Sequence, residues 1–287
     1  MSRSLVEGLL LPVPGGDGEG VAGVTFELRL GDCLDPVTGM ASLGDGSIDH
    51  VITDPPYSRD LYLSFRTNRR GNHRADNTAP AGPIGKGSMA RGRRAPATPS
   101  FLALANESIG AADDVATPCC EQLIRTARRW ILIFHDAEGG EMWRVPLGEL
   151  HVRCGIWVKT NPMPQVSGDR PAQGFESLEI AHAKGRKRWN GGGRSAVWTE
   201  GAVQGNWTER AGNDHPCPKP EALMEKLIRD FTDPGDLILD PFSGSGTTGV
   251  AAIRLGRRFI GWERDLKYHA IALKRLTAAR EQLELCA

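Results

Sequence analysis

The fold of this chain is decided by Asp240-Pro241-Phe242-Ser243-Gly244-Ser245-Gly246-Thr247-Thr248-Gly249. The segment follows the apolar run 237–239 and precedes an amphipathic stretch, so it predicts a strand end, a tight turn and a helix start. Glycines allow the backbone to turn sharply and to approach a ligand closely. Glu263 ends the next predicted strand, where an acid accepts hydrogen bonds from ribose hydroxyls. Taken alone, the segment suits NAD as well as another nucleotide ligand, or a purely structural turn.

The apolar periodicity around this turn predicts alternating strands and helices. The predicted strands are 24–30, 48–53, 130–134, 151–158, 178–183, 237–239 and 258–262. The predicted helices are parts of 101–129, then 221–231, 247–255 and a long helix from 266 onward. Such alternation predicts a mainly parallel sheet with helices on both faces. We therefore expect one α/β domain over 1–287, interrupted by two irregular basic segments, 58–100 and 184–213.

The composition limits the function classes. Lys and Arg number 35, and so do Asp and Glu, so the 287 residues carry no global basic field. Any DNA affinity must therefore come from local clusters of basic residues. The six cysteines include no Cys-x-x-Cys pair and no metal-ligand spacing with His, which predicts reduced thiols in a cytoplasmic protein and no metal. The N-terminal segment resembles neither a signal peptide nor a membrane span.

A second motif, Asp54-Pro55-Pro56-Tyr57, comes directly after the predicted strand 48–53. It places a carboxylate, two rigid prolines and an aromatic ring at the end of an apolar run. In isolation such a tetrad is more often a proline-rich turn with an aspartate cap. Beside a nucleotide-binding turn, the same residues suit an enzyme that holds an exocyclic amine.

The two motifs, amine-binding tetrad first and cofactor turn last, resemble the amino-directed DNA methyltransferases, in the motif order of the beta class. The resemblance implies a Rossmann-like, circularly permuted S-adenosylmethionine-dependent methyltransferase fold. It implies that Asp54, Pro55, Pro56 and Tyr57 are catalytic. The residues that it places at S-adenosylmethionine are Asp32, Asp240, Phe242, Ser243, Gly244, Gly246, Thr247 and Glu263, with His215 and Lys219 closing over the methionine end.

The chemistry of methyl transfer explains the tetrad. An exocyclic amine on a nucleobase is a poor nucleophile because its lone pair is delocalised into the ring. Asp54 and the carbonyl of Pro55 would accept its two N–H bonds and direct the lone pair at the methyl group, while Tyr57 stacks on the extruded base. Transfer is then a direct displacement with no covalent intermediate.

The resemblance favours N6 of adenine, because aspartate opens the tetrad in most adenine-directed members. N4 of cytosine, where serine is commoner, is the alternative, and a noncatalytic binding protein or an NAD-dependent oxidoreductase are further ones. A carbon-directed cytosine enzyme would need a cysteine after a proline at a strand end, which neither Cys119 nor Cys217 provides. His135-Asp136 is interpreted as a structural pair and left out of the site.

Two basic regions remain for the expected double-stranded DNA. The region 59–94 belongs to the insertion after Tyr57, and 184–213 stands where the family's target-recognition segment would lie. The predicted phosphate contacts are Lys184, Arg186, Lys187, Arg188 and Arg194. Trp189 and Trp198 are candidates for contacts with bases or sugars. A homodimer, a cognate restriction endonuclease and a single-stranded or RNA substrate stay open, and no membrane partner is expected.

Overall fold

The computed structural model describes residues 25–57, 112–164, 171–203 and 218–286, and their strands form one eight-stranded sheet. The strands are β1 (Phe26–Leu30), β2 (His50–Thr53), β3 (Trp130–His135), β4 (His151–Lys159), β5 (Phe175–His182), β6 (Val197–Glu200), β7 (Leu237–Asp240) and β8 (Arg258–Glu263). The helices are α3 (Ala112–Thr126), α4 (Gly140–Leu147), α6 (Glu221–Phe231), α7 (Thr247–Arg254) and α8 (Leu266–Cys286), with short 3-10 turns at Met40–Ser42 and Gly148–Leu150.

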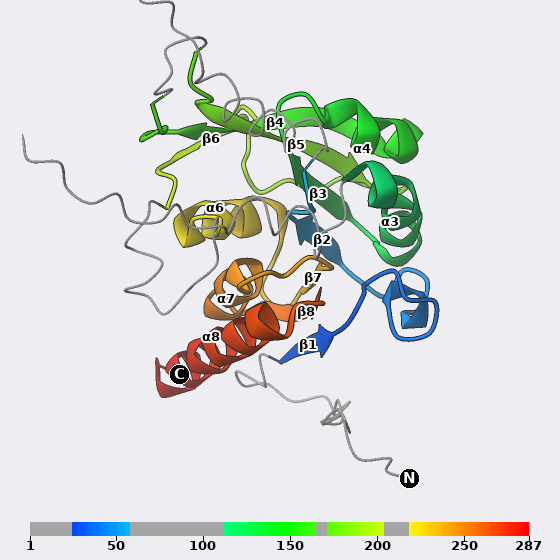
Figure 1. Cartoon of the computed structure of the whole chain (residues 1–287), viewed down its shortest axis with the longest axis vertical. Coiled ribbons are helices and arrows are strands. Elements are labelled where there is room, and N and C mark those ends of the chain that lie inside the picture. The colour runs from blue at the N-terminus through cyan, green and yellow to red at the C-terminus, as the bar shows by residue number, and fades with distance from the viewer. Residues whose placement is uncertain (1–24, 58–111, 165–170, 204–217, 287) are drawn as a thin grey trace, which may run out of the picture.

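The strand order is β1-β8-β7-β2-β3-β5-β4-β6 (Figure 1). β5 runs antiparallel to its neighbours β3 and β4, and the other neighbouring strands are parallel. β7, which comes late in the chain, lies inside the sheet between β8 and β2. The mainly parallel sheet and the permuted order are therefore confirmed.

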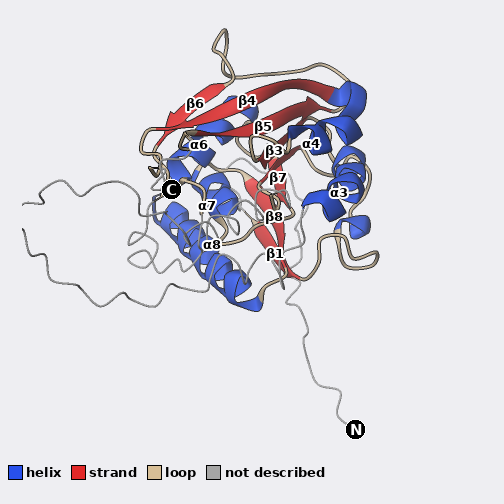
Figure 2. Ribbon diagram, turned by 45° about the horizontal axis from the view of Figure 1, so that its top comes forward, coloured by secondary structure: helices blue, strands red, loops and turns tan. Residues whose placement is uncertain are grey.

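Helices cover both faces of the sheet, as Figure 2 shows: α6, α7 and α8 lie on one side, and α3 and α4 on the other. The apolar side chains divide in the same way. Leu132 and Phe134 of β3 belong to the core under the first group of helices, whereas Ile131 and Ile133 belong to the core under the second. This division follows from the alternation of side chains along a strand.

The elements agree with the sequence pattern except at two places. β6 lies within the segment 184–213, which was expected to be irregular, and the helix α4 was not predicted. β6 is only four residues long, and α4 contains Pro146, so each gives a weak periodic signal. The insertion 58–100 lies outside the described residues.

Gly249 decides how closely α7 approaches its neighbours. A Cβ at this position would lie 2.5 Å from Leu276 Cδ2 of α8 and 2.7 Å from Phe259 Cε1 of β8. Glycine to alanine normally stabilises an exposed helix interior by about 1 kcal/mol. Here we expect Gly249→Ala to lower the free energy of unfolding by about 1–3 kcal/mol, because the added methyl group overpacks the core.

Urea denaturation of the Gly249→Ala protein measures this effect. Gly193→Ala is the matched control, because a Cβ there meets nothing within 4 Å. Equal midpoints for the two variants would contradict the close packing of α7.

Candidate active site

The carboxyl ends of β7, β2, β8 and β1 bring the two sequence motifs together. Because these strands are parallel, the residues that follow them meet at one edge of the sheet. Thr53 Oγ1 donates to Asp240 Oδ1 at 2.7 Å, and the Gly31 amide donates to the Glu263 carbonyl at 3.0 Å. Segments that are far apart in the sequence therefore form a single site.

The glycine turn after β7 lies against β8. Gly244 and Gly246 have φ of 52° and 79°, a backbone conformation that favours glycine. The Ser243 amide donates to the Trp262 carbonyl at 2.9 Å, and the Gly246 amide donates to the Ser243 carbonyl at 2.7 Å. A Cβ on Gly261 would lie 2.2 Å from Ser243 Oγ, so β8 needs glycine here for the turn to approach.

The other residues of the predicted cofactor group surround this turn. The Phe242 amide donates to Asp240 Oδ1 at 3.1 Å, and the ring of Phe242 packs at the edge of the core. Thr247 begins α7. Asp32 Oδ1 accepts the Leu34 amide at 2.9 Å just after β1. His215 lies outside the described residues.

Two carboxyl groups beside the turn have raised pKa values. Burial raises the pKa of Asp240 to about 6, against hydrogen bonds from Thr248, Thr53 and the Phe242 amide. Burial likewise raises the pKa of Glu263 to about 7, against bonds from the amides of Asp265, Gly244 and Arg264. A desolvated acid that faces the backbone of a glycine turn is suited to accept hydroxyl groups of a ligand.

Asp54 belongs to a buried ionic cluster around Lys219. Lys219 Nζ lies 2.5 Å from Asp54 Oδ2, 2.9 Å from Tyr57 Oη and 3.1 Å from Glu176 Oε2. Its ammonium also lies 5.0 Å from the centre of the Phe134 ring. Lys219 was expected at the methionine end of the cofactor, and in the structure its ammonium lies at the tetrad. The cluster thus fixes the carboxylate that opens the tetrad.

Glu176 and Lys159 complete this cluster, and sequence reasoning missed both roles. Tyr57 Oη donates to Glu176 Oε2 at 2.5 Å, and Lys159 Nζ lies 2.7 Å from Glu176 Oε1. Burial alone would raise the pKa of Glu176, but Lys219 and then Lys159 lower it to about 2. The sequence feature that could have revealed Glu176 is its spacing on β5. It shares a strand face with the buried Leu178 and Ile180, where a carboxylate is unusual.

The second carboxylate oxygen of Asp54, Oδ1, is a buried hydrogen-bond acceptor that has no donor in the described structure. Oδ1 is shielded from solvent, and it accepts no hydrogen bond from the described residues. Burial raises the pKa of Asp54, and the nearby ammonium of Lys219 opposes this rise. A buried acceptor without a donor is costly, so such an atom fits a site that receives a donor from a ligand.

The rest of the tetrad holds the chain at this edge of the sheet. Pro55 is buried, and Pro56 is partly buried. The Tyr57 carbonyl accepts the Ala112 amide at 3.2 Å, so the start of α3 lies beside the tetrad. The basic region 59–94 itself lies outside the described residues.

The five basic residues predicted to contact DNA are not brought to this edge. They follow β5, which runs antiparallel to β3, and therefore lie near the start of β3. The Arg188 carbonyl accepts Trp130 Nε1 at 2.5 Å, and Arg188 Nη1 lies 3.1 Å from Asp233. Arg194 forms an ion pair with Asp230 at the end of α6. Lys184, Arg186 and Lys187 are exposed on the same segment.

The two tryptophans of this segment serve packing. Trp198 is 4% exposed, and its Nε1 donates to Asp230 Oδ2 at 2.9 Å. Trp189 is partly buried against the same core, with its ring centre 4.9 Å from that of Phe231. The expectation that Trp198 contacts bases is therefore wrong, because a short strand, β6, carries it into the core.

Comparison with solved structures defines the class of fold. The crystal structure of an M1.HpyAVI–SAM complex matches 88% of this chain and 99% of its own, with a TM-score of 0.56 and 23% identity. TTHA0409 of Thermus thermophilus, described as a DNA modification methylase and complexed with S-adenosyl-L-methionine, matches with a TM-score of 0.56 and 19% identity, over 89% of this chain and 94% of its own. The cytosine-N4-specific PvuII DNA methyltransferase matches with a TM-score of 0.54 and 16% identity, over 90% and 92%. The chain has the Rossmann-like methyltransferase fold.

Comparison of sequences shows similarity to DNA methylases. Residues 153–274 match the model of a family described as DNA methylase, for N6 and N4 methyltransferases. The type II methyltransferase M2.DpnII of Streptococcus pneumoniae is 42% identical over 137 residues, which are 44% of this chain and 50% of that protein. M2.LlaDCHI of Lactococcus lactis subsp. cremoris is 39% identical over 137 residues, 42% and 48% respectively. The chain spans about half the length of these relatives, and its resemblance to amino-directed DNA methyltransferases is confirmed.

None of the helices in the described ranges has both the length and the apolar character needed to cross a lipid bilayer.

Proposed function

We propose that this protein transfers a methyl group from S-adenosylmethionine to the exocyclic N6 of adenine in DNA. The observation that carries the proposal is the buried Asp54 Oδ1, an acceptor without a donor among the described residues, beside the glycine turn. The DNA methylase match of residues 153–274 supports the same function. Two of the solved methyltransferases that share this fold are complexes with the same cofactor.

The residues at the glycine turn fit this cofactor. Gly244 and Gly246 would allow the backbone to approach it, and the desolvated carboxyl of Glu263 would accept its ribose hydroxyls. When bound, S-adenosylmethionine supplies a methyl group on a positively charged sulfur. The raised pKa of Glu263 makes binding of the ribose dependent on pH near neutrality.

The ionic cluster assigns a separate task to each oxygen of Asp54. Oδ2 is held by Lys219, so the carboxylate cannot rotate freely, and Oδ1 is left to accept one N–H of the substrate amine. An acceptor that is already oriented before charge develops on the amine lowers the barrier more than a mobile one. Lys219 is thus a positioning residue, because it acts through Asp54.

Adenine is preferred over cytosine because the resemblance associates an aspartate in the first tetrad position with adenine. Cytosine N4 is the second candidate, because the cytosine-N4-specific PvuII enzyme has a similar fold. We further propose double-stranded DNA as the substrate. Contacts from Lys184, Arg186, Lys187, Arg188 and Arg194 stay a prediction, and on this fold they would engage DNA away from Asp54.

The test incubates the full chain with S-adenosylmethionine and unmethylated mixed-sequence duplex DNA, followed by digestion and mass spectrometry of the nucleosides. The proposal expects N6-methyldeoxyadenosine. N4-methyldeoxycytidine would keep the mechanism and correct the base. Cofactor binding without any methylated DNA product at high enzyme concentration would contradict the proposal.

Cofactor affinity is expected to depend on pH through Glu263. Its pKa of about 7 means that the folded protein holds a proton there at lower pH, while ribose hydroxyls bind best to the ionised carboxylate. The dissociation constant of S-adenosylmethionine should therefore rise by up to about tenfold per pH unit below pH 7, and level off above it.

Isothermal titration calorimetry measures the dissociation constant of S-adenosylmethionine at each pH. The pH range should run from about one and a half units below the pKa of Glu263 to about one unit above it. Glu263→Gln should bind more weakly at the alkaline end and should lose the part of the dependence centred near 7. Asp240, with a pKa of about 6, is expected to leave a weaker dependence at lower pH in that variant. The same pH profile in both proteins would exclude Glu263 as the titrating group.

A further inference from the structure

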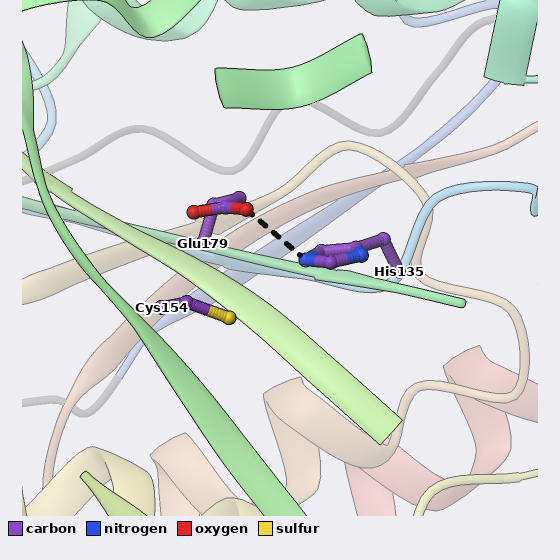
Figure 3. Close-up of side chains that lie close together, drawn as sticks. All are labelled: His135, Cys154 and Glu179. Carbon is purple, nitrogen blue, oxygen red and sulfur yellow. Dashed lines mark ion pairs between the residues drawn. The ribbon is translucent and has the colours of Figure 1, made fainter. Parts of the chain in front are cut away.

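Three side chains that commonly bind metals meet on the sheet face opposite Lys219. They are His135 at the end of β3, Cys154 on β4 and Glu179 on β5 (Figure 3). One nitrogen, the sulfur and one carboxylate oxygen all lie within 4.8 Å of one another. Phe134 and Glu176, which face Lys219, occupy strand positions of the opposite parity, so the sheet separates the two clusters.

Strand register creates this cluster. Cys154 pairs with Glu179 across β4 and β5, and Glu179 pairs with Ile133 across β5 and β3. His135 follows Ile133 by two residues and thus shares its face. Spacing along the chain cannot reveal such a site, and for this reason no metal signal was visible in the sequence. Side chains on three hydrogen-bonded strands form a rigid set of ligands.

His135 is oriented as metal-binding histidines usually are. Its Nδ1 lies 2.6 Å from the Asp136 carbonyl oxygen, and because a carbonyl only accepts, Nδ1 carries the proton. Nε2 is therefore the nitrogen that faces the cluster. It is buried and lies 3.5 Å from Glu179 Oε1, an ion pair whose geometry is too long for a good hydrogen bond. A backbone carbonyl behind one ring nitrogen fixes the other toward a metal.

Glu179 offers one oxygen to a cation. Its side chain is fully buried, and Oε2 accepts a hydrogen bond from His151 Nε2 at 2.6 Å. Oε1 accepts one from Arg144 Nη2 at 2.7 Å, and the Arg144 side chain is 49% exposed. A metal ion at Oε1 would replace the positive charge of Arg144, whose side chain has room to turn into solvent.

The cluster is packed closely by α4 on one side and is open to solvent at Cys154. Gly140 of α4 borders the cluster, and a Cβ there would lie 2.9 Å from His135 Cε1 and 3.0 Å from Glu179 Oε1. Cys154 is exposed, so an ion has access from solvent. Nitrogen, sulfur and carboxylate oxygen together are the ligand set of Zn²⁺, whereas Mg²⁺ and Ca²⁺ prefer oxygen alone.

We propose that His135 Nε2, Cys154 Sγ and Glu179 form a zinc site. The ion joins β3, β5 and β4, where the sheet changes from parallel to antiparallel, and His151 supports the carboxylate from behind. The site is separate from the proposed methyl transfer and does not rest on it.

The experiment titrates the chelator-treated full chain with Zn²⁺ against a chromophoric competitor, and with Co²⁺ while recording its absorption. We expect one equivalent of zinc and a near-ultraviolet thiolate-to-cobalt band. Cys154→Ser should abolish that band and weaken zinc binding by more than about tenfold. Loss of a residue that only supports a metal ligand already costs about tenfold in metal affinity, so loss of a ligand should cost more. His269→Gln, a histidine remote from the cluster, should bind as the unchanged protein does.

Arg144→Gln gives an independent test at an exposed residue. Removing the competing cation should tighten zinc binding by about tenfold, the effect of roughly 1.4 kcal/mol of charge repulsion. A purely structural ion pair would show no zinc binding in any variant, and this result would overturn the proposal. Binding that is equal in Cys154→Ser and the unchanged protein, or weaker in Arg144→Gln, would overturn it as well.

Discussion

Asp54→Asn is expected to lower kcat for DNA methylation by at least about 100-fold, with little change in the affinity for S-adenosylmethionine. Removal of one oriented hydrogen-bonding group at a reacting centre costs about this much. The amide replaces one acceptor oxygen by a donor, so it loses either the bond from Lys219 or the bond to the substrate amine. The amide has the same size as the carboxylate and the glycine turn is unchanged, so cofactor binding should be preserved.

Single-turnover methylation and calorimetric titration of the cofactor measure the two quantities. Asp45→Asn is the matched control, since this carboxylate is 81% exposed and pairs only with Arg125 in the described structure. A variant that methylates DNA at the normal rate would exclude Asp54 from catalysis. A variant that loses cofactor affinity equally would mean that Asp54 maintains the fold of the site.

Lys219→Met is expected to lower the free energy of unfolding by about 3 kcal/mol, because it leaves carboxylates without their cation in a desolvated place. The Lys219 side chain is 9% exposed, and those of Asp54 and Glu176 are 26% and 14% exposed. Because these side chains are partly exposed, we expect a loss of stability at the lower end of the range for breaking a buried ion pair. Urea denaturation provides the measurement.

A second substitution separates charge from packing. Lys219→Met combined with Glu176→Gln should recover part of the lost stability, because fewer buried negative charges remain. Lys226→Met is the control, since its ion pair with Glu200 is 47% exposed on the lysine side and should contribute less than about 1 kcal/mol. If both substitutions lowered the free energy of unfolding equally, the ion pairs of Lys219 would stabilise the protein no more than an exposed surface pair does.

Local patterns were sufficient to predict most elements of the fold. Helix α6 places Leu223, Leu227 and Ile228 on one buried face, and such periodicity is visible in the sequence. The antiparallel direction of β5 was not visible, because strand direction depends on the connection between β4 and β5 rather than on the residues of either strand. β6 was missed for its shortness, although it adds an edge to the sheet.

The sequence predicted that the two contiguous motifs would meet, and it missed the contacts that depend on strand register. Asp54 and the glycine turn are continuous in sequence, and the parallel strands β2 and β7 bring them together as expected. Glu176 reaches Lys219 only through the pairing of β5 with β3 and β4. The basic segment after β5 lies at the opposite end of the strands for the same reason, because a strand that runs backwards delivers the next residues of the chain to the other edge.

The strand order also determines when the protein can fold during its synthesis. β1 pairs only with β8, and β2 needs β7 on one side, yet β7 and β8 are the last of the described strands to be made. Until residues 237–263 have left the ribosome, the nascent chain therefore exposes unpaired strand edges, which are prone to pair with other chains. The permuted arrangement therefore delays completion of this sheet until β7 and β8 have been made.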